Sequence, residues 1–297
     1  MTPASLARML ALAAIWGASF LFMRVAVPVL GAELLVLLRT LLAALFLAAV
    51  ALAWRRPLRW RAHARHYLTL GLLNSALPFV LWAHAAGALP ATLLSVLNAT
   101  APIWGAVVGA AWARRWPAAP VLGGLALGLA GVAVLVGVES LALPPGAGWA
   151  VVAALAASFC YGLSTTYART APGVEPLANA QGSMWAAALW MLPLWLATAQ
   201  PVPVPSPPVA GAALALGVVC SGVAYLLYFR LLADIGPVRT LTVTFLIPVF
   251  GTLWGVLFLG ESVGWHTLAG AALVLGGTAL ASGWRWSRAA AGGAGGA

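Results

Sequence analysis

Long apolar stretches separated by short turns set the pattern of this chain. The turns are rich in Pro, Gly and Arg, and few charges interrupt the stretches. The hydrocarbon layer of a membrane is roughly 30 Å thick, so a helix needs about 20 apolar residues to cross it. Backbone polar groups find no water in lipid, which favours helices for these segments. The predicted spans are residues 5–27, 32–53, 67–86, 93–112, 120–138, 147–168, 178–199, 209–231, 240–259 and 265–285.

Composition supports this interpretation. Hydrophobic residues make up 63% of the 297 residues and charged residues only 7%, whereas soluble domains carry about 25% charged residues. The sequence therefore predicts an all-α membrane protein with ten transmembrane helices, inserted as a multi-pass protein in contact with lipid.

The basic residues indicate how the chain crosses the membrane. The formal net charge is +10, yet the arginines lie in short turns and not on one amphipathic face, which argues against a nucleic-acid partner. Arg enriches cytoplasmic loops, so we expect both termini and the even-numbered loops to be cytoplasmic. The arginines in these places are Arg8, Arg55, Arg56, Arg59, Arg61, Arg65, Arg114, Arg115, Arg169, Arg230, Arg239, Arg285 and Arg288.

The two halves of the chain resemble each other. A shift of 146 residues aligns spans three to five with spans eight to ten, so that Pro102 meets Pro248 and Gly105 meets Gly251. With slightly different shifts, Trp16-Gly17-x-Ser19 meets Tyr161-Gly162-x-Ser164, and Arg39 meets Gln181.

Five spans per unit is an odd number, so the second unit enters the membrane from the opposite face. The expected result is an inverted repeat, an arrangement found in many secondary transporters. We expect half-repeats at residues 1–138 and 147–285 and a disordered Gly/Ala tail at 286–297.

A family resemblance rests on motifs in both halves. They are Ile15-Trp16-Gly17-Ala18-Ser19-Phe20, Arg39, Pro102, Pro248 and Gly260-Glu261 before a Gly-rich last span. This pattern resembles the EamA-type, ten-helix branch of the drug/metabolite transporter superfamily, over about residues 11–281. Within that branch it looks most like bacterial exporters of aromatic and other neutral amino acids.

The resemblance implies a bacterial inner-membrane protein with a central cavity that opens alternately to either side. Spans one, three, four, six, eight and nine would line the cavity, and spans five and ten would pack outside it. One departure is visible, because Arg114-Arg115 stands in the first half where Gly260-Glu261 stands in the second.

The energy source of transport is left open by the sequence. The chain contains no Lys, which a P-loop needs to reach the phosphates of a nucleotide, so we expect neither ATP-driven pumping nor a cofactor. The acidic residues fall near span ends or in loops, which favours facilitated diffusion or coupling through a group at a span end. His84 is a candidate for such a charge role. The acids are Glu33, Glu139, Glu175, Asp234 and Glu261.

Polar and aromatic side chains recur on single faces of the spans. Asn74, Pro78 and Trp82 follow one another at every fourth position of span three. Ligand pockets are mostly apolar with a few placed polar groups, so we predict that these stripes converge on a substrate. The candidate substrate-binding residues are Trp16, Ser19, Asn74, Trp82, Asn98, Ser158, Tyr161, Tyr225, Tyr228 and Thr244.

Each of these candidates also has a structural interpretation. Ser, Thr and Asn join helices, Trp and Tyr form interfacial belts, and Gly-x-x-x-Gly brings helices together. For Gly105, Gly109, Gly251 and Gly255 we favour packing. Pro78, Pro102 and Pro248 are candidate gating hinges or static kinks. Arg39 lies inside span two and needs a partner on another helix or a substrate carboxylate.

The leading hypothesis is therefore a permease, and not an enzyme, that exports small neutral metabolites such as amino acids by alternating access. The alternatives are a drug or other metabolite carrier and, with less support, a lipid-processing enzyme. Cys160 and Cys220 lie inside spans, where we expect neither a disulfide nor a metal site. The Gly-rich last span could mediate a homodimer.

Overall fold

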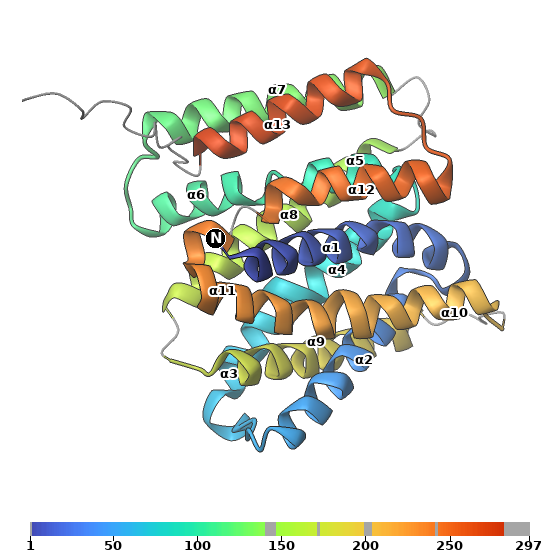
Figure 1. The fold of residues 1–297 in the computed structure, drawn as a ribbon, viewed down its shortest axis with the longest axis vertical. Coiled ribbons are helices and arrows are strands. Elements are labelled where there is room, and N and C mark those ends of the chain that lie inside the picture. Colours follow the sequence, from blue (N-terminus) through green and yellow to red (C-terminus); the bar gives the residue numbers. More distant parts are fainter. Residues whose placement is uncertain (1, 140–146, 171–172, 199–203, 241–242, 282–297) are drawn as a thin grey trace, which may run out of the picture.

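Helices account for nearly all of the described chain. The computed structural model describes residues 2–139, 147–170, 173–198, 204–240 and 243–281, and Figure 1 shows the helices running roughly parallel in one bundle. Six of them are long and apolar enough to cross a membrane, and three shorter helices are apolar. The predicted tail at 286–297 and the end of span ten lie outside the described residues.

The first half contains five consecutive rods. They are α1 (Pro3–Leu30), α2 (Ala32–Ala53), the joined segments α3 (Trp60–Gly71), η1 (Leu72–Ala76) and α4 (Leu77–Ala86), the pair α5 (Ala91–Asn98) and α6 (Ala101–Trp112), and α7 (Ala119–Glu139). Gly31 separates the first two rods with φ of +74°, a backbone angle that glycine adopts without steric cost.

The second half repeats this order. Its rods are α8 (Ala147–Thr170), α9 (Pro176–Thr198), the joined segments α10 (Pro207–Leu214), η2 (Ala215–Val223) and α11 (Ala224–Thr240), then α12 (Val243–Leu259) and α13 (Trp265–Ala281). The backbone of Gly236 is not helical, with φ of 78°, so α11 is interrupted there by a kink.

Helix contacts follow the repeat. The contact of α1 with α12 has its counterpart in the contact of α8 with α6, and the contact of α4 with α8 has its counterpart in that of α11 with α1. The pairs α2–α9 and α7–α13 map onto themselves when the halves are exchanged. This pattern is the one expected for an inverted repeat with a pseudo-two-fold axis.

Matched glycines make close helix crossings in both halves. A Cβ on Gly17 would lie 2.8 Å from the backbone nitrogen of Gly251, and a Cβ on Gly162 would lie 2.8 Å from that of Gly105. Any side chain there would push the two helices apart. The packing role expected of Gly105 and Gly251 is thus confirmed, whereas a Cβ on Gly109 would meet open space.

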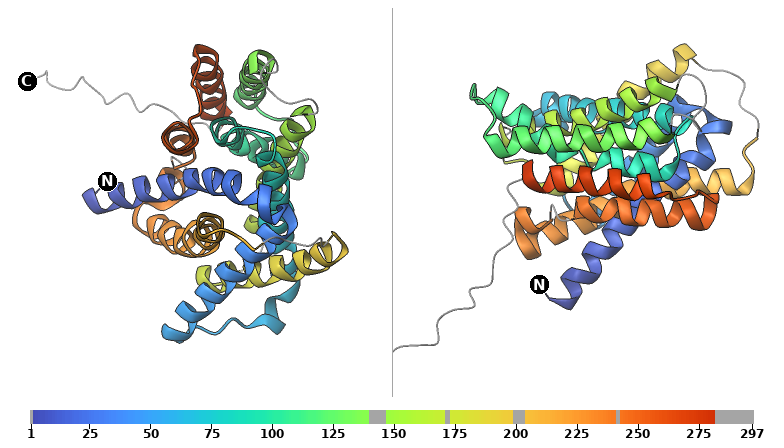
Figure 2. Two further views of the ribbon diagram at one scale, coloured as in Figure 1. Left: turned by 90° about the vertical axis from the view of Figure 1, so that its right-hand side faces the viewer. Right: turned by 90° about the horizontal axis from the view of Figure 1, so that it is seen from above.

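The helices α7 and α13 lie side by side along one edge of the bundle (Figures 1 and 2). A Cβ on Gly124 would lie 2.5 Å from the carbonyl oxygen of Gly277, and one on Gly131 would lie 2.8 Å from that of Gly270. Gly270 and Gly277 of span ten therefore pack against α7 within the chain, and the homodimer stays a prediction.

The two ends of the bundle differ in the turns they hold. We call the end with Gly31 and the turns 87–90 and 260–264 the Glu261 end, and the end with the turns 54–59 and 113–118 the arginine end. In Figure 1 the Glu261 end is on the right and the arginine end on the left. The sequence places the arginine end on the cytoplasmic side, which remains a prediction.

Candidate functional site

Two π-helical segments occupy matching places in the halves. In the first half, η1 contains Ser75, and in the second half η2 contains its counterpart Ser221. A π-helix carries an extra residue per turn and occurs frequently at functional sites. The Ser221 hydroxyl donates to the carbonyl oxygen of Leu216 at 3.0 Å, five residues earlier, which leaves its oxygen able to accept a further bond.

Arg39 of α2 lies against this π segment. Its Nε donates to the Ser221 hydroxyl oxygen at 2.9 Å, and its guanidinium carbon is 3.7 Å from the centre of the Phe79 ring. The side chains of Tyr161 and Tyr225 lie near its charge. Arg39 is only 6% exposed, so a cation is held inside the bundle, and the inter-helix partner expected from the sequence is Ser221.

A hydrogen-bonded network adjoins Arg39. Asn74 Nδ2 donates to the Tyr225 hydroxyl at 2.9 Å, and the Ser164 hydroxyl donates to Asn74 Oδ1 at 3.0 Å. These contacts join η1, α11 and α8. We call Arg39, Asn74, Phe79, Tyr161, Ser164, Ser221 and Tyr225 the Arg39 cluster; it draws on both halves of the chain.

Aromatic side chains extend the cluster toward α1. The Trp16 and Tyr228 rings lie 5.8 Å apart, and Phe20 meets Trp82 edge to face at 5.3 Å. The Tyr161 hydroxyl lies beside the Trp82 indole, whose buried N–H donates no hydrogen bond to a described residue. Ser19, on the same turn of α1, is 5% exposed and its hydroxyl is likewise unpaired.

The acidic side chains in the described part of the chain lie away from Arg39. Glu33 pairs with His84, Glu175 lies 3.9 Å from Arg56, and Asp234 pairs with Arg8 and Arg230. Glu261 instead binds backbone N–H groups of α5. The buried charge of Arg39 is thus balanced by hydroxyl dipoles and an aromatic face, and by no carboxylate of these residues.

His84 lies at the Glu261 end. Its Nε2 is 3.0 Å from Glu33 Oε1, and its side chain is 50% exposed. The charge role suggested for His84 would therefore act at the surface of the bundle, far along α4 from Asn74.

Four other candidate residues lie at the break in span four or in span nine. Ser158 donates to the carbonyl oxygen of Leu97 at 3.1 Å, joining α8 to α5, and Asn98 ends α5. Pro102 stands in the first turn of α6, where its missing N–H costs nothing. Thr244 lies in the first turn of α12.

The remaining candidate hinges are Pro78 and Pro248. Pro78 stands in the first turn of α4, directly after the π segment, and Pro248 lies inside α12. The structure thus places all three prolines at or within helix irregularities, and their gating role remains a prediction.

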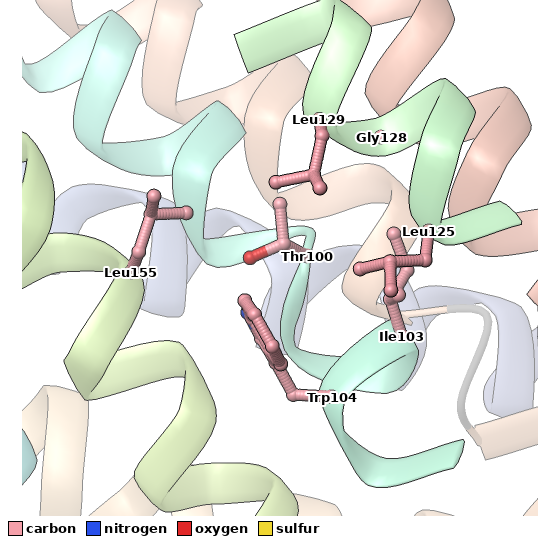
Figure 3. A pocket seen from close by; sticks show the side chains of 7 residues that line it. All are labelled: Thr100, Ile103, Trp104, Leu125, Gly128, Leu129 and Leu155. Carbon is pink, nitrogen blue, oxygen red and sulfur yellow. The ribbon is translucent and has the colours of Figure 1, made fainter. Parts of the chain in front are cut away.

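A small apolar hollow lies beside the α5–α6 break, with Trp104 and Leu155 facing across it (Figure 3). Its volume of about 10 Å³ is close to that of one water molecule, far below the size of a ligand pocket. It is a packing defect and not a substrate site. Its lining residues are Thr100, Ile103, Trp104, Leu125, Gly128, Leu129 and Leu155.

The candidate residues predicted from the sequence do not include three members of the cluster, namely Phe79, Ser164 and Ser221. The sequence repeat aligns Ser164 with Ser19. This alignment was a sequence signal that a polar side chain at position 164 matters. Phe79 carries no such signal, because one more phenylalanine in an apolar span is unremarkable until its ring is found against a guanidinium.

The paired halves, crossed helices and central polar cluster define an integral membrane protein of the inverted-repeat transporter class. The chain belongs to the EamA-like transporter family, which matches it twice, at residues 5–137 and 148–283. A solved structure titled only "Crystal structure of protein" has the same fold, with a TM-score of 0.65 and 20% identity over 95% of this chain and 97% of that chain. None of the curated proteins matches this chain.

Proposed function

We propose that this protein exports small neutral amino acids, aromatic ones included, across the bacterial inner membrane by alternating access. Both termini would lie in the cytoplasm. The observation that carries the proposal is the Arg39 cluster with its aromatic extension, because it joins helices of both halves and combines a few polar groups with several aromatic rings. Such a lining fits a small molecule with a polar head and an apolar side chain.

The inverted repeat supports the alternating part of this proposal. When two halves of opposite orientation exchange conformations, a site between them becomes open to the other side of the membrane. Groups from α2 and η1 of one half and from α8 and α11 of the other meet in the cluster, so a relative movement of the halves changes access to it.

The test is uptake of radiolabelled phenylalanine, tryptophan and alanine into proteoliposomes of the purified protein, with and without a proton gradient. We expect saturable flux without a gradient and a reduced flux in Asn74→Ala and Trp82→Ala. Trp265→Ala is the matched control, because Trp265 is 74% exposed on α13 and should leave flux unchanged.

The other outcomes are equally informative. Flux only with a gradient would contradict the facilitated mechanism, and His84→Gln would then be tested for loss of coupling. No flux of any amino acid through folded protein would overturn the amino acid assignment and favour a carrier of drugs or other metabolites on the same scaffold.

A further inference from the structure

Arg39 keeps unused hydrogen-bonding capacity inside the bundle. A guanidinium has five N–H donors, and of these the structure uses the Nε–H, which bonds to Ser221. The two terminal nitrogens donate no hydrogen bond to any residue that the structure describes. We propose that these terminal nitrogens bind the carboxylate of the substrate, and that this contact, more than any contact to an amino group, defines the transported class.

Burial makes the contact energetically important. Placing a charge in the interior without a partner is costly, and ionisable side chains inside membrane proteins are usually functional for that reason. Arg39 is 6% exposed. A planar carboxylate meets the guanidinium fork through two parallel hydrogen bonds, which is the strongest neutralising contact available to Arg.

The repeat shows that the cation is present in one half only. The counterpart of Arg39 is Gln181, and the counterpart of its partner Ser221 is Ser75. Gln181 Oε1 and the Ser75 hydroxyl are both buried and form no hydrogen bond to a described residue. A bound carboxylate therefore has one preferred place, beside α2 and η2, and the substrate is held in one orientation.

The Arg39 cluster offers fewer groups for binding an ammonium group than for binding a carboxylate. The Asn74 amide is already engaged by Tyr225 and Ser164, and the acidic side chains of the described residues lie elsewhere. Carboxylates that lack an amino group should therefore bind nearly as well as amino acids. This inference rests on the proposed transport function but goes beyond it, because it proposes that the protein selects its substrates by their carboxylate group.

The test uses unlabelled competitors of radiolabelled phenylalanine uptake in proteoliposomes. We expect 3-phenylpropanoate, which lacks the amino group, to compete within a few-fold of phenylalanine. Phenylalaninamide and 2-phenylethylamine, which lack the carboxylate, should compete roughly tenfold to a hundredfold more weakly, the loss expected for hydrogen bonds to a charged group. These measurements use the unaltered protein, so no folding defect affects them.

Variants then assign the effect to Arg39. In Arg39→Gln the two halves carry the same residue at this position, and the preference for carboxylates over amides should disappear. Arg39→Lys should keep part of it, because the charge remains without the fork. Arg24→Gln is the control; Arg24 donates to the carbonyl oxygen of Ala86 at the Glu261 end, and its loss should not change the order of the competitors.

The results separate this inference from the proposed function. Phenylalanine uptake inhibited equally by the amide and the carboxylate would overturn the Arg39 assignment and leave amino acid transport standing. If phenylalanine itself is not transported, direct binding of 3-phenylpropanoate is measured by tryptophan fluorescence quenching. Binding that depends on Arg39 would support the assignment while the amino acid proposal fails, and no binding would overturn both.

Discussion

The two ends of the bundle are held together by different chemistry. At the Glu261 end, the Glu261 carboxylate accepts hydrogen bonds from the backbone N–H of Ala91 at 2.6 Å, the N–H of Thr92 at 2.9 Å and the Thr92 hydroxyl at 2.7 Å. It thereby caps the N-terminus of α5, where unpaired N–H groups and the helix dipole favour an anion.

The repeat-related positions at the arginine end lack the acceptor and two of the three donors of this cap. With the shift of 146 residues, Pro237 stands for Ala91, Val238 for Thr92 and Arg115 for Glu261. Proline has no N–H, valine has no hydroxyl, and arginine carries the wrong charge for a helix N-terminus. The missing acid noted in the sequence is therefore matched by missing donors.

At the arginine end an ion pair joins two helices. Asp234 of α11 pairs with Arg8 of α1 and, within α11, with Arg230 at 3.2 Å, and the side chains of Arg8 and Arg230 are 33% and 67% exposed. Exposed pairs contribute about 0–1 kcal/mol and are screened by salt. The helices are therefore held together less strongly at the arginine end than at the Glu261 end. We expect them to separate first at the arginine end.

The largest expected effect comes from disrupting the glycine helix crossings that both halves contain. Gly17→Leu and Gly162→Leu each place a side chain against the backbone of a crossing helix. Both variants should lose about 3 kcal/mol or more of stability, and by similar amounts, because the crossings are repeat-related. Thermal unfolding in detergent, followed by size-exclusion chromatography, measures this.

Gly109→Ala is the control for these substitutions, since a Cβ there meets open space. It should unfold at the same temperature as the unaltered protein. A large loss in only one of the Gly17 and Gly162 variants would show that the two crossings are not equivalent.

A smaller effect is expected from substitutions that make the helix caps at the two ends of the bundle more alike. Glu261→Gln weakens the cap and should cost about 2 kcal/mol, because charged acceptors form stronger hydrogen bonds than neutral ones. Protection of the Ala91 and Thr92 amides, measured by hydrogen exchange, should fall locally. The reverse change Arg115→Glu should produce no gain of that size, because Pro237 and Val238 supply fewer donors; an equal gain would contradict the comparison.

The smallest effect concerns the ion pairs. Asp234→Asn should cost about 0.5 kcal/mol at low ionic strength and less at high salt. It should increase labelling of a cysteine placed at Ser5, which is 3% exposed in α1, more than Glu261→Gln does, because the first change loosens the arginine end and the second the opposite one. Unchanged labelling in Asp234→Asn would show that this pair does not hold α1 against α11.

Much of the fold could be predicted because lipid imposes simple rules. Span lengths, Gly and Pro spacing and the 146-residue shift predicted the spans and the repeat, since each depends on local sequence. Span four was predicted as one continuous segment, but it is divided into α5 and α6. The break lies at Ala99 and Thr100, just before Pro102, which favours an extended or turn conformation ahead of it.

The site was less accessible to sequence reasoning. Asn74, Tyr161 and Tyr225 were predicted as polar groups within spans, and the structure brings them together; their binding of substrate stays a prediction. The π segments η1 and η2 carry no sequence signal, because the extra residue per turn is stabilised by packing between helices. The contact of Arg39 with Phe79 is likewise a product of tertiary structure, because the two positions are 40 apart in the sequence.

The helix pairs that map onto themselves have a consequence for energetics. If the halves exchange conformations as proposed, the pairs α2–α9 and α7–α13 return to equivalent helix contacts, so residues that are the same in both halves of these pairs contribute nothing to the equilibrium between the two states. Only positions at which the halves differ can bias that equilibrium. The Glu261 hydrogen bonds have no counterpart at the arginine end, and about 2 kcal/mol of such stabilisation changes the population ratio roughly thirtyfold. A single carboxylate outside the binding cluster can thus determine which side of the membrane the resting transporter faces.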